Sequence, residues 1–384
     1  MNKTPSIQEL FWSFFRLGLT AFGGPAMVAQ IRKMAVGEKE WLSDASFRNG
    51  VALCQMVPGA TAMQAAAYVG LRSRGIGGAA ASFTGFGLPA FLIMLILSAS
   101  YLRAHTLPAV VSAFSGLQVV VVALVANAAF TFGKTWLKDW KGVFIALAAA
   151  VMFGFGVHPI GVILIAGLCG LGFYHRQIFP AAVVSGDRKS YSLKPLAWIL
   201  LIAALAFILL FLFQRRFFDL AFLMTKVDLF AFGGGFSSLP LMFNEVVNVR
   251  AWMDSLTFLD GIALGQVTPG PIVITATFIG YLQYGLRGGV IATVSIFLPS
   301  FLMVVGTVPY YDRLRSSPNF NRALRGILYS FVGLLLSVTI HFGLNVPWDV
   351  IRIILAGGTF AALFFNVRLI YPVIAGIVIS LLLL

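Results

Sequence analysis

The sequence predicts an all-α, polytopic helical membrane protein made of two homologous repeats, with helices broken by glycine and proline. Composition is the first reason, because 59% of the 384 residues are hydrophobic and only 10% are charged. Soluble domains have roughly 45–50% apolar and about 25% charged residues. The second reason is a motif that occurs twice, about 210 residues apart. The third is a series of nearly charge-free stretches long enough to cross a bilayer as helices.

These charge-free stretches predict the membrane-spanning helices in chain order. They cover residues 49–71, 75–102, 104–133 and 142–174, then 195–214, and then 261–286, 288–311 and 326–348. Most exceed the roughly 20 residues that a helix needs to cross about 30 Å of hydrocarbon. We expect about six spans in each repeat and one connecting span, roughly thirteen in total.

The doubled motif divides the chain into three parts. Residues 1–174 form the first repeat, residues 175–220 a polar loop and the connecting span, and residues 221–384 the second repeat. Equivalent positions keep an offset of 210 or 211, as when Leu88-Pro89-Ala90-Phe91 aligns with Leu298-Pro299-Ser300-Phe301. If the chain crosses the membrane an odd number of times between equivalent points of the two repeats, the repeats are inverted. If the glycine-broken first segment of each repeat instead enters and leaves the membrane on the same side, the repeats are parallel. The Lys and Arg bias of the loops favours a cytoplasmic N-terminus.

The net charge of +14 has an ordinary explanation in a membrane chain. On a soluble protein it would suggest nucleic acid, but loop Lys and Arg act first as topogenic signals, so we expect no nucleic-acid partner. The two cysteines, Cys54 and Cys169, lie in apolar runs and predict no disulfide framework. No metal-ligand spacing, phosphate-binding loop or nucleophile motif occurs in the sequence. We therefore expect no metal, no cofactor and no catalytic residue.

The doubled motif interrupts apolar sequence where a spanning helix would normally continue. Each break exposes N–H groups at the start of the next helix, and these attract anions. Paired breaks in matching halves are typical of a transport site, although any single break also fits a simple kink or close helix packing. The residues are Gly23, Gly24, Pro25, Pro58 and Gly59 in the first repeat, and Gly233, Gly234, Gly235, Pro269, Gly270 and Pro271 in the second.

Polar side chains near the breaks extend the predicted anion site. Arg16 and Lys226 occupy equivalent positions before the two glycine segments. Cations at depth in a membrane are usually functional, although both side chains could instead reach the headgroup region. Gln55 and Gln266 stand shortly before the Pro-Gly breaks and could donate amide hydrogens to an oxyanion or join neighbouring helices. Two cations and the helix ends together would balance a dianion.

Near the breaks, the second repeat has three acidic residues, Asp228, Glu245 and Asp260, that have no acidic equivalent in the first. Burial and a nearby anion both favour the protonated form of a carboxyl group. These three residues are therefore candidates to carry a coupling proton. Asp228 could instead neutralise Lys226, and His341, within an apolar span, fits a core histidine better than a proton relay.

As a set, these motifs resemble the chromate ion transporter family in its long form, with two repeats in one chain. The residues that carry the resemblance are Phe22-Gly23-Gly24-Pro25, Trp41, Gln55-Met56-Val57-Pro58-Gly59 and their second-repeat partners ending in Pro269-Gly270-Pro271. The resemblance implies a bacterial inner-membrane protein that exports chromate, driven by the membrane potential or the proton gradient, and so confers chromate resistance. The first repeat departs from the doubled pattern, with Pro58-Gly59-Ala60 in place of Pro-Gly-Pro.

Together these observations predict a transporter of a dianionic oxyanion. The residues indicate an anion site at paired broken helices, and the resemblance implies chromate as substrate and export as direction, through alternating access and the proton motive force. Sulfate has the same charge and tetrahedral shape, so sulfate transport, or an uptake carrier for an oxyanion, stays open. An intramembrane enzyme is the weaker alternative. Besides the anion and the lipid bilayer, a homodimer is the expected assembly.

Overall fold

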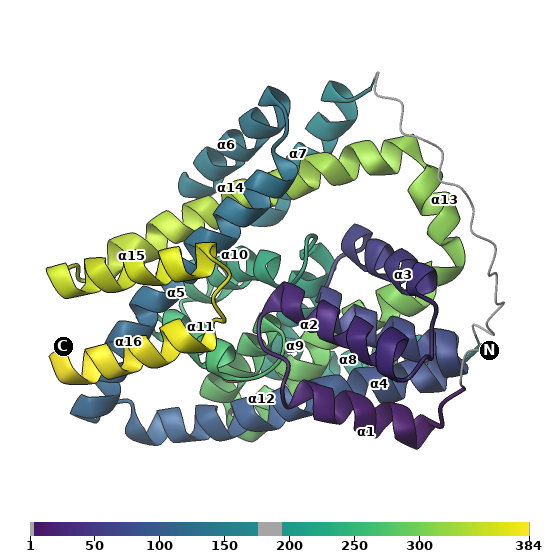
Figure 1. Cartoon of the computed structure of the whole chain (residues 1–384), viewed down its shortest axis with the longest axis horizontal. Coiled ribbons are helices and arrows are strands. Elements are labelled where there is room, and N and C mark those ends of the chain that lie inside the picture. The colour runs from purple at the N-terminus through teal and green to yellow at the C-terminus, as the bar shows by residue number, and fades with distance from the viewer. Residues whose placement is uncertain (1–3, 176–193, 384) are drawn as a thin grey trace. The chain divides into compact units, whose positions relative to one another are not determined.

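The computed structural model describes residues 4–175 and 194–383, and within these ranges the chain is helical without a β-strand (Figure 1). Most of the predicted polar loop therefore lies outside the described residues. The first repeat contains α1 (Ile7–Gly18), α2 (Gly24–Arg32), the π-helical segment η1 (Lys33–Glu38), α3 (Asp44–Met56), α4 (Thr61–Ala104), α5 (Pro108–Trp136), α6 (Trp140–Gly154) and α7 (Pro159–Phe173).

The connecting helix is α8 (Lys194–Phe213). The second repeat follows with α9 (Arg215–Phe230), the 3₁₀ turn η2 (Gly235–Ser237), α10 (Ser238–Phe243), the π-helical segment η3 (Asn244–Val249), α11 (Ser255–Val267), the 3₁₀ turn η4 (Ile272–Ile274), α12 (Thr275–Thr307), η5 (Val308–Tyr310), α13 (Tyr311–Ser316), α14 (Pro318–Asn345), α15 (Val350–Phe364) and α16 (Ile370–Leu383). The all-α prediction is confirmed.

Equivalent residues begin equivalent helices in the two repeats. Asp139 caps α6 by accepting a hydrogen bond from the Gly142 N–H at 2.7 Å, and Asp349 caps α15 by accepting one from the Arg352 N–H at 2.8 Å. A carboxylate at this position satisfies a helix N–H group that has no partner within the helix. The repeat therefore extends from sequence to local hydrogen bonding.

The chain forms two compact units that do not coincide with the two repeats. Unit 1 consists of Met1–Ile96, Pro180–Ser238 and Thr268–Ser316, and unit 2 of Leu97–Phe179, Leu239–Val267 and Ser317–Leu384. Each unit takes segments from both repeats. The repeat boundaries inferred from the sequence remain a prediction about the chain's organisation.

Two helical hairpins, within α4 and α12, belong to unit 1. The backbone reverses inside α4 at Arg74 and Gly75 and inside α12 at Tyr284 and Gly285, where the glycines have φ of 66° and 60°. The Ser82 hydroxyl then donates to the Ala66 carbonyl at 2.7 Å across the first hairpin. The apolar stretches 49–71 and 261–286 are each interrupted at the Pro-Gly break that the sequence predicts, and the second stretch also includes the reversal at Gly285.

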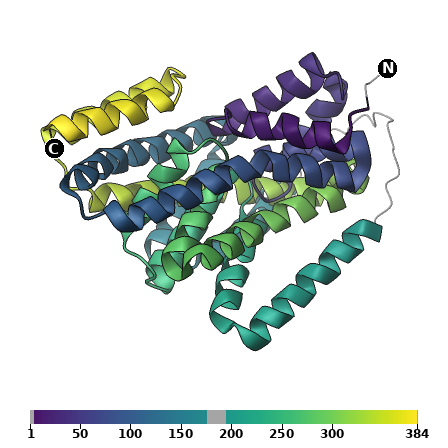
Figure 2. The ribbon, with the colours of Figure 1, turned by 90° about the horizontal axis from the view of Figure 1, so that it is seen from below.

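Five helices in the described part of the chain are long and apolar enough to cross a membrane, and four apolar helices are shorter. The number of long helices is smaller than the roughly thirteen predicted spans because α4 and α12 each contain a reversal and because the last two apolar helices of each repeat, α6–α7 and α15–α16, are short. Helix α8, teal in Figure 2, lies at the edge of unit 1 and packs on α9 through Phe207 and Phe211 against Phe218.

In unit 2, helices of one repeat pack against helices of the other. Helix α14 of the second repeat packs against α6 and α7 of the first, and α5 of the first packs against α15 and α16 of the second (Figure 1). Glycine permits both approaches, since a Cβ atom on Gly326 would lie 2.0 Å from the Ala166 carbonyl oxygen and one on Gly116 2.5 Å from that of Gly376. Small residues of this kind let helix backbones approach closely in membrane proteins.

Candidate functional site

The two Pro-Gly breaks both lie in unit 1, and each is bonded to the other repeat. The Gly59 N–H donates to the Ala231 carbonyl at 2.9 Å, and the Gly270 N–H donates to the Ala21 carbonyl at 2.9 Å. Ala231 and Ala21 stand directly before Phe-Gly-Gly in their own repeats. The break of one repeat is therefore fixed to the start of the glycine segment of the other, in both directions.

The helices end where the sequence predicts. In the first repeat α3 stops at Met56 and α4 starts at Thr61. In the second repeat α11 stops at Val267, and the helical turn η4 starts at Ile272 after Pro271. Gly59 and Gly270 have φ of 120° and 127°, a conformation that residues with a Cβ atom avoid. The N-terminal N–H groups of the helix after each break have no partner within that helix.

The glycine segment of the second repeat contacts both post-break segments of unit 1. A Cβ atom on Gly234 would lie 3.2 Å from Thr61 Oγ1, and one on Gly235 would lie 3.1 Å from side-chain atoms of Ile272 and Val273. Gly233 and Gly234 have φ of 92° and 101°. The segment therefore brings its backbone close to the first turns after both breaks.

The glycine segment of the first repeat differs in its continuation. Gly23 has φ of 78°, and α2 then begins at Gly24 with Pro25 in its first turn. Nothing lies within 4 Å of a Cβ atom built on Gly23. A proline in the first helical turn loses no hydrogen bond, because that N–H has no helical partner.

A buried polar network adjoins the first-repeat break. The Ser300 hydroxyl lies 3.0 and 2.8 Å from the two carboxylate oxygens of Asp228 and donates to them, while its oxygen accepts the Ala60 N–H at 2.9 Å. The Gln64 amide donates to the Pro58 carbonyl at 2.6 Å. The side chains of Asp228, Ser300 and Gln64 are almost completely buried. The alternative that Asp228 neutralises Lys226 remains a prediction.

Sequence reasoning missed Ser300 and Gln64. One signal was available, because Ser300 replaces Ala90 in an otherwise matched motif, as Asp228 replaces Gly18. Both polar substitutions fall in the second repeat, and the structure joins them. Gln64 aligns with Thr275, whose hydroxyl donates to the Ile272 carbonyl at 2.8 Å, so each repeat places a polar side chain on the backbone of its break.

The predicted cations and the first glutamine are less buried than expected. Arg16 lies on α1 and is exposed, Lys226 on α9 is half-buried, and Gln55 at the end of α3 is exposed. The protein itself does not bury Arg16, so the cost of burying a charge within the protein is no argument for its function. The role of all three in anion binding remains a prediction.

The remaining predicted residues belong to unit 2. The carboxylate of Asp260 accepts hydrogen bonds from the Tyr101 hydroxyl and the Gln118 amide, both at 2.8 Å. Gln266, on the same helix, is buried, and its amide nitrogen has no hydrogen-bond partner among the described residues. This leaves one donor of the predicted site available to a ligand.

Glu245 is held by two basic side chains in unit 2. Its carboxylate is bonded to Arg250, and its other oxygen lies 2.8 Å from His158 Nε2. His158 Nδ1 accepts the Ile160 N–H at 3.2 Å, so Nε2 carries the proton and donates to Glu245. His341 packs 4.8 Å from the Phe243 ring and lies 3.4 Å from the Ser255 hydroxyl, as expected for a core histidine.

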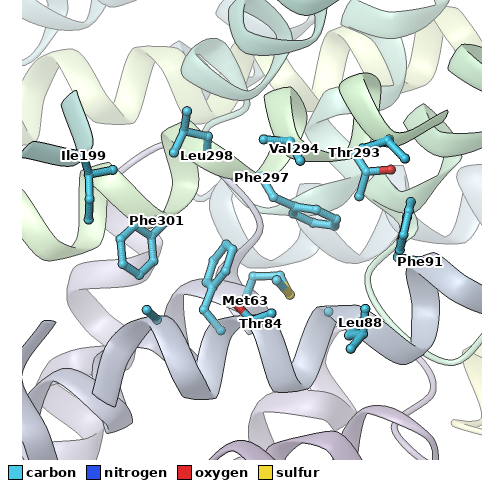
Figure 3. Close-up of a pocket in the computed structure, with 14 residues that line it drawn as sticks. Met63, Thr84, Leu88, Phe91, Ile199, Thr293, Val294, Phe297, Leu298 and Phe301 are labelled. Atoms are coloured by element: carbon cyan, nitrogen blue, oxygen red, sulfur yellow. The ribbon is translucent and has the colours of Figure 1, made fainter. Parts of the chain in front are cut away.

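A cavity of about 430 Å³ in unit 1 lies between α4 and α12 (Figure 3). Equivalent residues of the two repeats form its walls, since Leu88 pairs with Leu298 and Phe91 with Phe301, and Ile199 of α8 joins them. The side chains around it are almost entirely hydrocarbon. An unpaired dianion in such surroundings would lose its hydration without compensation, so this cavity is unsuited to an oxyanion. Among the described residues, no cluster of His, Cys, Asp and Glu side chains could hold a metal ion.

The fold and the site define a class of protein: apolar helices, two repeats and paired helix breaks are the features of a membrane transport protein. More particularly, the chain belongs to the chromate transporter family. The sequence model described as "Chromate transporter" matches residues 8–171 and again residues 218–381. This double match is the fused, two-repeat form that the doubled motif predicts, and members of the family are transport proteins rather than enzymes.

Relatives match the chain over most of its length. An uncharacterised transporter of Methanocaldococcus jannaschii is 43% identical over 385 residues, covering 100% of this chain and 96% of its own. A chromate transport protein of Pseudomonas aeruginosa is 34% identical over 350 residues, covering 87% of this chain and 80% of its own. One of Cupriavidus metallidurans is 29% identical over 373 residues, covering 97% and 91%. No solved structure matches the chain.

Proposed function

We propose that this membrane protein transports chromate and that its physiological direction is export. Membership of the chromate transporter family and the similarity to chromate transport proteins of Pseudomonas aeruginosa and Cupriavidus metallidurans support chromate as the substrate. The observation that carries a specific site is the reciprocal bonding of the two Pro-Gly breaks to the opposite repeats. This arrangement gathers two helix starts and a glycine segment in unit 1.

The proposed anion site uses backbone N–H groups of the segments after the breaks. Helix N-termini carry partial positive charge and bind oxyanions without a dedicated side chain. Arg16 and Lys226 supply the full positive charges from equivalent positions. Gln55 supplies an amide donor in unit 1. Gln266 belongs to unit 2, and its unpartnered amide nitrogen supports its own predicted role as an anion ligand.

We further propose alternating access between inverted repeats, in a bacterial-type inner membrane with a cytoplasmic N-terminus and as a homodimer. The proton motive force drives the cycle, and the buried carboxylates Asp228 and Asp260 are the leading carriers of a coupled proton. Glu245 is the weaker candidate, because Arg250 compensates its charge. Burial favours the neutral form of a carboxyl group, and the side chains of Asp228 and Asp260 are both buried, which supports the first two.

Reconstitution tests this function directly. Liposomes that contain the purified protein and are loaded with labelled chromate should release it faster than protein-free liposomes loaded in the same way, when a potential or pH gradient is imposed. A tenfold excess of sulfate on the same side should compete if the site recognises only charge and tetrahedral shape. Absence of protein-dependent chromate flux under every gradient would contradict the proposal, and flux of sulfate alone would favour the sulfate alternative.

A further inference from the structure

We propose that Ser300 is a positioning residue that ties the first-repeat break to the charge of Asp228, so that only one of the two breaks responds to a proton. This inference deepens the proposed transport function and rests on it for its physiological meaning. It concerns residues 57–60, the side chain of Ser300 on α12 and the carboxylate of Asp228 on α9. All of them belong to unit 1.

One hydroxyl group connects the carboxylate to the backbone of the break. A serine hydroxyl has one proton to donate and two lone pairs that accept. Ser300 gives its proton to Asp228, at 2.8 and 3.0 Å from the two oxygens, and accepts the Ala60 N–H at 2.9 Å. The orientation that serves the ionised carboxylate therefore also leaves a lone pair for Ala60.

The break is held tightly around this contact. A Cβ atom on Gly59 would lie 2.1 Å from Ser300 Oγ. On either side, the Gln64 amide fixes the Pro58 carbonyl at 2.6 Å and the Ala231 carbonyl fixes the Gly59 N–H at 2.9 Å. Backbone polar groups at membrane depth need such partners. Loss of the Ser300 bond would leave the Ala60 N–H as the unsatisfied group of this turn.

Protonation of Asp228 changes this contact because a hydrogen bond to an ionised acceptor is about twice as strong as a neutral one. A neutral Asp228 holds Ser300 less firmly and can itself donate to the hydroxyl, which frees Ser300 to turn away from Ala60. The charged side chains nearby in sequence are Lys226 on α9 and Arg287 on the packed helix α12, and residues 57–60 carry none.

The break of the second repeat provides a natural comparison. The equivalent of Ser300 at this break is Ala90 of the first repeat, and a Cβ atom on Gly270 would lie 2.7 Å from the Ala90 methyl group. Gly18 replaces Asp228, and its backbone approaches the Phe86 carbonyl so closely that a Cβ atom would lie 2.5 Å from that oxygen. Both breaks thus have the same backbone bond to the opposite repeat, but Ala90 and Gly18 occupy the positions equivalent to Ser300 and Asp228.

Hydrogen–deuterium exchange on the full-length purified protein tests the link without any substrate. The peptides to compare cover residues 57–64 and 268–275, at pH 6 and pH 8, with rates corrected for the intrinsic pH dependence of exchange. We expect faster corrected exchange at pH 6 in the first peptide and no change in the second. Ser300→Ala should raise exchange of the first peptide about tenfold, as expected for loss of one hydrogen bond, and abolish its pH response.

Three further variants complete the experiment. Asp228→Asn should hold the first break in its low-pH state at both pH values. Ala90→Ser, the matched change at the equivalent position, should leave the first break as in the wild type. Ser300→Cys, with a similar volume and a weak S–H donor, should fall between wild type and Ser300→Ala, and it serves if the alanine variant does not fold.

The result that overturns the inference is a wild-type pH response in Ser300→Ala, or an equal response at both breaks. Chromate flux in liposomes then separates this inference from the proposed function. Ser300→Ala should flatten the pH profile of flux while chromate binding is retained. If the wild type carries no chromate, the proposed function fails, and the exchange experiment still decides whether Ser300 links Asp228 to the break.

Discussion

At the scale of single residues, the three second-repeat carboxylates have partners of different charge. Asp228 is held by a hydroxyl group, Asp260 by a phenol and an amide, and Glu245 by Arg250 and His158. A buried carboxylate beside a cation stays ionised, whereas burial alone favours the neutral form. Asp228 and Asp260 are therefore suited to proton transfer, whereas Glu245 is suited to a structural ion pair.

We therefore expect different effects from neutral replacements of these side chains. Asp228→Asn and Asp260→Asn should shift or flatten the pH dependence of chromate flux in liposomes. Glu245→Gln should leave the pH profile unchanged but lower the thermal stability, because removing one partner of a buried ion pair costs about 3–5 kcal/mol. Wild-type pH profiles in both Asn variants would mean that coupling runs through other groups or does not occur.

Arg16 and Lys226 allow a test of charge against geometry in anion binding. Arg16→Ala and Lys226→Ala should each leave a folded protein with greatly weakened chromate binding. Arg16→Lys should retain binding if a point charge suffices, and little if the guanidinium binds two oxygens at once. Lys226→Arg is the reciprocal change. Lys33→Ala, at an exposed cation paired with Glu38, is the control, and wild-type affinity in both alanine variants would show that the two cations do not bind the anion.

At the scale of helices, unit 2 depends on close backbone approach between repeats. Gly326→Val on α14 should force α14 away from α7, because the added Cβ would lie 2.0 Å from the Ala166 carbonyl oxygen. Overpacking of this kind costs typically about 1–3 kcal/mol. Gly343→Val on the same helix is the matched control, since nothing lies within 4 Å of its added Cβ. Thermal unfolding should show a lower Tm for Gly326→Val alone, and equal Tm values would contradict this packing.

The sequence was most informative about uninterrupted helices. The stretches 104–133 and 195–214 correspond to α5 and α8 within a few residues, because apolar length is the property that a membrane helix requires. Apolar length does not show, however, where the chain reverses direction within an apolar stretch. Residues 261–286 appear as one span by hydropathy, yet Pro269-Gly270-Pro271 ends one helix and Gly285 reverses the next.

The candidate site could be predicted only in part for a similar reason. Repetition of Pro-Gly identified both breaks, since proline and glycine have a direct backbone effect. It could not identify Ser300, which contacts Ala60 from a position 240 residues away in the chain. A serine in an apolar helix commonly bonds to its own backbone. Only the fold shows that this one bonds to a break in the other repeat.

At the scale of the whole molecule, the two repeats exchange contacts in both units. The breaks bond to opposite repeats in unit 1, and the long helices pack on opposite short pairs in unit 2. Reciprocal contacts are typical of a two-fold relation between similar parts. Within this pseudo-symmetry the polar residues are unequal, so two related conformations of the chain would differ in charge and hydrogen bonding around the breaks.

The charge of the proposed substrate leads to a prediction about the driving force. A dianion that leaves a negative-inside compartment gains about 2.3 kcal/mol per charge for each 100 mV, so export should rise with an imposed inside-negative potential. Liposomes with a potassium diffusion potential and internal labelled chromate provide the measurement, and a protonophore added at fixed potential isolates the proton component. Asp228→Asn should remove only the component that the protonophore removes in the wild type. Export that is unaffected by both the protonophore and collapse of the potential would exclude coupling to the proton motive force.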